Sequence, residues 1–225
     1  KLEGDDDTYL GLVALQGFLT TGPWHNPGAR KFDDLEAMKL LRKRLASNDA
    51  DRVRSVLFLL SYNKTGGSGN QDMRSHYVPE LNAVLFHEDE GIRRQARGVA
   101  QWLDEKYAQG LAEQLVDAFE KSDDVQTKLA ALRAIAAMKE KASVPDDWLK
   151  AIITESDNKQ LQIAAAVAME RKGEVEARKL LSRSAYSSDE GSFGRGKEVD
   201  QMQKDLDAER LRVFTETHYQ GGGFF

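Results

Sequence analysis

One adjacent histidine–carboxylate pair, His87-Glu88, could contribute to metal chemistry, at the start of the stretch 87-HEDEGIRRQARGVAQWL-103. A protein metal site needs several nitrogen and oxygen ligands that converge on one point. The other histidines, however, have no carboxylate beside them in the sequence: His25, His76 and His218. We therefore expect no metal site, and we expect the acids at 88–90 to complement the dipole of a helix that begins there.

A second near-motif, 191-GSFGRGKE-198, has the G-x-x-x-x-G-K spacing of a phosphate-binding P-loop. The next residue is Glu198, where a P-loop needs Ser or Thr to bind magnesium, and a carboxylate there repels phosphate. No apolar strand precedes the stretch. We expect it to belong to a flexible Gly/Ser loop over residues 186–198, with no nucleotide or other cofactor.

The composition excludes several function classes. Cysteine is absent, which removes disulfides, thiolate metal sites and cysteine nucleophiles, and which suits a cytoplasmic or a periplasmic protein. The formal net charge of −5 argues against a general nucleic-acid binder, which needs an excess of Lys and Arg. No apolar run approaches the roughly 18 residues that a membrane-spanning helix requires. The expected partner is a protein, whose identity the sequence leaves open, as it does the oligomeric state.

Apolar spacing predicts helices along most of the chain. In 35-LEAMKLLRKRLA-46, for example, Leu35, Met38, Leu41 and Leu45 recur at helical intervals. No segment shows a sustained alternation of period two, so the predicted fold class is all-α. The predicted helices cover approximately residues 35–46, 53–62, 72–86, 89–106, 108–121, 124–140, 146–154, 159–172, 174–184 and 199–217.

Some of these helices are internally similar. Four segments each combine a short acidic turn with a helix rich in small or aliphatic residues: 49-DADRVRSVLFLL-60, 88-EDEGIRRQARGVAQWL-103, 122-SDDVQTKLAALRAIAAM-138 and 156-SDNKQLQIAAAVAM-169. When the segments are aligned on Val53, Ile92, Val125 and Leu161, the spacings are 39, 33 and 36 residues. Such spacings are typical of one helical hairpin per repeat.

The turn-and-helix units at 51–60 and 89–103 resemble HEAT repeats, whose second helix begins with an acidic turn, a Val or Ile, an Arg and then alanines. The resemblance covers residues 33–172, although the third and fourth units carry Gln in place of the Arg. It implies a right-handed α-α superhelix whose inner helices line a concave surface. An armadillo-like or irregular helical array is the alternative. The expected organisation is a capping helix and loop (1–32), repeats (33–185), and a loop, helix and tail (186–225).

The resemblance also bears on His87-Glu88, which is similar to the histidine–glutamate pairs of deoxyhypusine hydroxylase, a HEAT-repeat enzyme with a di-iron centre. That enzyme carries several such pairs, one per repeat. The equivalent turns of this chain hold no histidine, because they are Asn48-Asp49, Ser122-Asp123 and Ser156-Asp157. A helix-capping turn is therefore the preferred interpretation of His87.

The candidate partner-binding residues are Arg52, Arg94 and Arg97, which the repeats place on successive inner helices, where they could meet an acidic surface. For Arg54 and Arg93 we expect a structural role instead, with each guanidinium bonded to an acid of a neighbouring turn. Three further candidates lie outside the repeats. Trp24 is expected to be exposed in a loop, and Phe224 with Phe225 is expected to dock the tail into an apolar groove.

The preferred function is a non-catalytic scaffold that binds a protein through the concave face. The alternative is an enzyme on a HEAT-like frame, similar to the alkylpurine DNA glycosylases. Those enzymes need aromatic residues and a carboxylate in a basic groove. Trp102 with Asp104, and Trp148 with Asp147, could serve, but the acidic carboxyl-terminal half would repel DNA. Both tryptophans fall at apolar-periodic positions, so we expect them to pack in the core.

Overall fold

Helices form every regular element of the described residues. The structure, a computed structural model, describes residues 36–62, 77–173, 176–186 and 195–218. The all-α prediction is confirmed for this part of the chain. The helices are α2 (Glu36–Leu45), α3 (Ala50–Tyr62), α4 (Val78–Val84), α5 (Glu90–Ala100), α6 (Glu105–Lys121), α7 (Val125–Met138), the 3-10 helix η4 (Lys139–Lys141), α8 (Asp146–Glu155), α9 (Lys159–Arg171), α10 (Ala177–Ser184) and α11 (Arg195–His218).

Two of the boundaries that differ from the sequence prediction concern a turn and a loop. The helix predicted over 89–106 ends at Ala100, and the helix predicted over 108–121 begins at Glu105, because the chain turns between these two residues. The apolar pattern continues through this turn. At the turn, the Lys141 ammonium donates to the carbonyls of Gln101 (3.3 Å) and Leu103 (3.1 Å). The final helix begins at Arg195, so part of the predicted 186–198 loop is helical.

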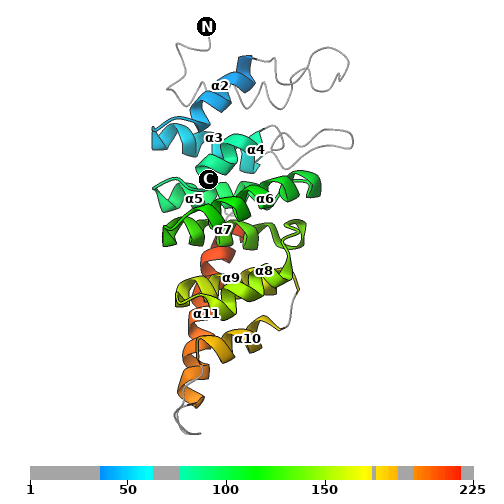
Figure 1. Ribbon diagram of the computed structural model, residues 1–225. Coiled ribbons are helices and arrows are strands. Elements are labelled where there is room, and N and C mark those ends of the chain that lie inside the picture. The colour runs from blue at the N-terminus through cyan, green and yellow to red at the C-terminus, as the bar shows by residue number, and fades with distance from the viewer. Residues whose placement is uncertain (1–35, 63–76, 174–175, 187–194, 219–225) are drawn as a thin grey trace.

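The helices stack in two layers (Figure 1). We call α3, α5, α7 and α9 the odd layer, because each packs against the next one along the stack. The even layer contains α2, α4, α6, α8 and α10, with contacts from α2 to α4, from α4 to α6 and from α8 to α10. Consecutive helices pair across the layers as α2 with α3, α4 with α5, α6 with α7 and α8 with α9. Each hairpin thus covers the apolar side of its neighbours.

The core is continuous along the stack and is densest around α7 and α9. Both helices bury residues on nearly every side, from Leu129 to Met138 and from Leu161 to Met169. A helix that is apolar all round must be covered on all sides. The even layer covers one side, and α11 contacts both helices from another.

One hydrogen-bonded turn precedes each odd-layer helix. Its first side chain accepts a hydrogen bond from the backbone N–H two residues later, in the pairs Ser47–Asp49 (3.0 Å), His87–Asp89 (3.0 Å), Ser122–Asp124 (3.1 Å) and Ser156–Asn158 (3.2 Å). The residue that donates this N–H is the one we call the cap. The cap side chain in turn accepts a hydrogen bond from the backbone N–H three residues further on, at Arg52 (3.3 Å), Ile92 (3.1 Å), Thr127 (2.8 Å) and Leu161 (3.3 Å). His87 therefore belongs to a capping turn.

The caps give a better repeat register than the apolar anchors used above. They lie at residues 49, 89, 124 and 158, so their spacings are 40, 35 and 34 residues. Ile92 and Leu161 each stand three residues after their cap, but Val125 follows its cap directly and is only half-buried. The residue equivalent to Ile92 in the third unit is Thr127. The helix register follows the turn rather than the nearest apolar residue.

We predict that Asn158→Ala lowers the free energy of unfolding by about 1 kcal/mol, because the first N–H groups of α9 lose their side-chain acceptor. The neighbouring Asp157 is exposed and serves as a control, since Asp157→Ala should leave stability nearly unchanged. Urea unfolding followed by far-ultraviolet circular dichroism measures both variants. Equal losses in the two variants would contradict the capping role.

Candidate helix-binding surface

Helix α11 crosses the odd layer and contacts α9, α7 and α5. Figure 1 shows it, orange to red, running along the stack while the other helices lie across. Its buried side chains are Met202, Leu206, Glu209 and Val213. They recur at i, i+4, i+7 and i+11, which places them on one stripe of the helix. The odd-layer face over α5, α7 and α9 therefore holds a helix of the same chain.

A buried ion pair joins α11 to the middle of α7. Arg133 donates from Nε to Glu209 Oε1 (2.6 Å) and from Nη2 to Oε2 (3.0 Å), so the carboxylate is held by two parallel bonds. Both side chains are largely buried, at 11% and 6% exposure. Arg212 adds a bond to the same carboxylate at 3.1 Å. Bidentate arginine–carboxylate pairs fix orientation as well as contact.

A second ion pair joins α11 to the end of α9. Arg210 donates from Nε to Glu170 Oε2 (2.9 Å) and from Nη2 to the same carboxylate (2.7 Å). Arg178 of α10 reaches Glu170 as well, at 2.8 Å. Burial alone would lower the pKa of Arg210, but the hydrogen bonds that its guanidinium donates to Glu170 and then to Asp207 outweigh burial and raise that pKa. The guanidinium is therefore held in its charged form at this contact.

A third cluster lies where α10 ends. The hydroxyl of Tyr186 donates to Asp205 Oδ2 (2.6 Å), and Gln201 donates to Oδ1 (2.8 Å). The Lys159 ammonium lies 3.9 Å from the centre of the Tyr186 ring and 3.7 Å from Asp205 Oδ2. Burial raises the pKa of Asp205, but the hydrogen bonds from Tyr186 and Gln201 outweigh it and the net shift is downward. Burial, and next the bond to Asp205, raises the pKa of Tyr186.

We predict that Tyr186 makes stability sensitive to alkaline pH. Its pKa is raised in the folded state, so its contribution is fully present below the ordinary value of 10.0 and is lost as pH rises through the folded value. The difference in unfolding free energy between wild type and Tyr186→Phe should stay constant up to pH 9 and change above pH about 10. Urea unfolding at a series of pH values tests this. Tyr107→Phe is the control, because Tyr107 is exposed.

We also predict strong coupling between Arg133 and Glu209. Removing one member of a buried pair leaves the other charge without its partner, at a cost of about 3–5 kcal/mol. Removing both should cost less than the sum of the two single changes, because no charge is then stranded. The measurement is a double-mutant cycle with Arg133→Ala and Glu209→Ala, read by hydrogen exchange at the amides of α11. Additive losses would show that the pair does not hold α11.

The ion-pair residues define a common face on the odd layer. Arg133 lies nine residues after its cap, and Glu170 lies twelve residues after its cap. We call the positions nine and twelve residues after each cap the α11 track. On α5 the track residues are Gly98 and Gln101, and both are buried. On α3 they are Phe58, which is 52% exposed, and Ser61, which is half-buried. On α3, the α11 track therefore contains an exposed aromatic residue, Phe58.

The arginines expected to be structural differ in their partners. Arg54 donates from Nη2 to Asp89 Oδ2 at 2.5 Å, which joins α3 to the turn of the next unit as predicted. The backbone hydrogen bond from Ile92 is the main cause that lowers the pKa of Asp89, and Arg54 lowers it further. Arg93 instead caps its own turn, because Nη1 donates to the carbonyls of His87 (2.5 Å) and Glu88 (2.9 Å).

The structure separates the three arginines chosen as partner-binding candidates. Arg97 is fully buried at 0% exposure and donates to Glu90 at 2.7 Å, so its place is inside the stack and not on a partner surface. Burial raises the pKa of Glu90, but Arg97 and then Arg93 outweigh it and the net shift is downward. Arg52 pairs with its own cap, Asp49, at 3.3 Å.

Arg94 is the remaining candidate. It is exposed, and no hydrogen bond or ion pair involves it within the described part of the chain. Trp24, Phe224 and Phe225 lie outside the described residues.

The two tryptophans that were expected to pack in the core differ in their burial. Trp148 is partly buried and packs against the core rather than inside it. Its ring is in edge contact with Phe119 at 5.0 Å, and its Nε1 donates to Glu120 at 2.5 Å. Trp102 does not pack in the core, because its side chain is 37% exposed at the turn between α5 and α6.

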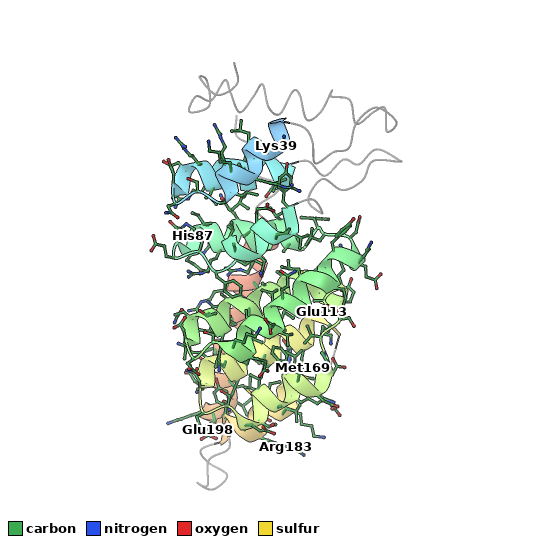
Figure 2. All side chains as sticks on the ribbon, turned by 45° about the horizontal axis from the view of Figure 1, so that its top comes forward. Lys39, His87, Glu113, Met169, Arg183 and Glu198 are labelled. Carbon is green, nitrogen blue, oxygen red and sulfur yellow. The ribbon has the colours of Figure 1, made fainter. Side chains whose placement is uncertain are left out.

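His87 lies at the edge of the stack (Figure 2). Among residues whose placement is described, no group of three or more His, Asp or Glu side chains could hold a metal ion.

Sequence reasoning missed the residues that hold α11, among them Arg133, Glu170 and Asp205. The usable signal was the position of the four cap residues in the sequence, because counting nine residues from its own cap places Arg133 and Phe58 at equivalent positions.

Comparison with protein-family models and with curated protein sequences gives no match. Within the described ranges, none of the helices is both long and apolar enough to cross a bilayer.

Proposed function

We propose that this protein is a non-catalytic binding scaffold, built as a HEAT-like right-handed superhelix, whose partner contributes an α-helix to the face of the odd layer. The observation that carries the proposal is α11, which lies across α9, α7 and α5 as a docked helix. A face that already holds one helix through a stripe of apolar side chains and charge pairs has the shape and chemistry for helix-in-groove recognition.

We assign the partner helix to the α11 track on α3. Phe58 is exposed there, and large aromatic side chains are frequent anchors in protein interfaces. Arg94 adds an exposed positive charge on the adjacent helix α5. The neighbouring Arg52 and Arg54 pair with Asp49 and Asp89, so the surface is close to neutral rather than strongly basic. The proposed partner helix is therefore amphipathic and mixed in charge.

The HEAT-like superhelix is supported by the recurring turns and by the alternation of layers. Each cap begins an odd-layer helix, and the cap spacing of 34 to 40 residues suits one hairpin per unit. The Arg54–Asp89 bond links successive units in the way that the resemblance implies.

We predict that Phe58→Ser and Arg94→Glu each abolish capture of a protein that the wild-type chain recovers from a source lysate. The first change removes the exposed aromatic side chain that the partner helix would bury, and the second replaces an exposed positive charge with a negative one. Tyr107→Ser is the matched control, since Tyr107 is an exposed aromatic residue on α6 in the even layer. Crosslinking from position 58 should then map the contact to a helical segment of the captured protein. Equal capture by all variants, or recovery of nucleic acid, would reject this function.

A further inference from the structure

Helix α11 is held in a different way from the central helix α9. Among its described side chains, the buried apolar ones are Met202, Leu206 and Val213, although the helix has 24 residues. By contrast, α9 buries every residue from Leu161 to Met169 within a helix of 13 residues. The segment that joins α10 to α11 has the sequence 187-SSDEGSFG-194, which is small and polar. In composition, α11 is closer to an amphipathic ligand helix than to a central core helix.

Charge pairs supply much of the remaining contact, and their order along α11 is specific. Asp205 meets Lys159 and Tyr186, Glu209 meets Arg133, and Arg210 meets Glu170. Along α11 the order of charges is therefore negative, negative, positive, and the residues that they meet on α7 and α9 have the opposite charges in the same order. Complementary charges of this kind fix register and exclude helices of the wrong pattern.

The helices beneath α11 are rich in alanine. Buried alanines recur along α7, from Ala130 to Ala137, and along α9, from Ala164 to Ala168. Small side chains let a crossing helix approach closely. Alanine side chains also have little apolar area to expose if that helix leaves. The free-energy cost of exposing them is correspondingly small, since that cost scales with area. The hairpins of the stack also contact one another directly, through pairs of helices that do not include α11.

We propose that α11 is a resident occupant of the partner-binding surface, and that a partner helix of matching pattern replaces it. That helix carries apolar side chains at i, i+4 and i+11 and a carboxylate at i+7, as Met202, Leu206, Val213 and Glu209 do in α11. The inference rests on the proposed function, because it extends the same odd-layer site from Phe58 on α3 to α9. Release of α11 makes the whole length of the face available to the partner.

The test uses full-length chains and a labelled synthetic peptide of residues 195–218. Leu206→Glu places a charge at a buried position of the resident helix, whereas Leu211→Glu makes the same change at a position that is 61% exposed. We expect Leu206→Glu to bind the peptide at least about tenfold more tightly than wild type or Leu211→Glu, because a larger fraction of molecules has the face open.

A charge-reversal arm tests the register. Arg133→Glu should bind a peptide carrying Glu209→Arg and should reject the wild-type peptide. Circular dichroism and thermal unfolding show whether each chain keeps the hairpin stack. If both Leu206→Glu and Arg133→Glu unfold the whole stack, or if both stay folded without binding their peptides, α11 is an integral helix and the proposal is overturned. Peptide failure with intact Phe58-dependent capture removes only this inference. Capture failure with intact peptide binding removes only the partner site on α3.

Discussion

The stack depends on a two-residue hydrogen-bond relay at the start of each odd-layer helix. A helix leaves its first N–H groups without internal acceptors, and burial makes that costly. Here Ser or His fixes the cap residue, and the cap side chain accepts from the helix, at each of the four turns that precede an odd-layer helix. Because the relay is local, it sets the first residue of each helix without help from distant contacts. The Arg54–Asp89 bond then connects one such start to the helix before it.

A fixed starting residue also fixes the rotation of each helix about its axis. Residues at the same distance from their caps therefore point in the same direction in every unit. Phe58 of α3 and Arg133 of α7 both lie nine residues after their caps, so they hold equivalent positions. Glu170 of α9 lies twelve residues after its cap, about one helical turn further on, and so also reaches α11. A surface that recognises a crossing helix can arise from such alignment without any insertion or special loop, since the repeat itself brings the side chains into line.

The helices and turns could be predicted from the sequence, but the location of α11 could not. Apolar periodicity reports which side of a helix is covered and not which element covers it. The sequence predicted a helix over residues 199–217, yet nothing local indicates that it crosses α7 and α9. For the same reason Arg97 looked like a surface residue, although it lies buried beside Glu90. Trp102 shows the opposite error, because its apolar neighbours continue through a turn where its side chain reaches solvent.

The balance between apolar and charged contacts bears on whether α11 can be exchanged. Burial of large apolar side chains gives strength with little directional preference, whereas buried charge pairs give little net strength but penalise mismatched partners heavily. The α11 contact combines a short apolar stripe with Arg133–Glu209 and Arg210–Glu170, so it favours selectivity over affinity. A competing helix needs the correct order of charges more than a larger apolar face. Reversing Arg133 should therefore change which helix binds, rather than weaken every helix equally.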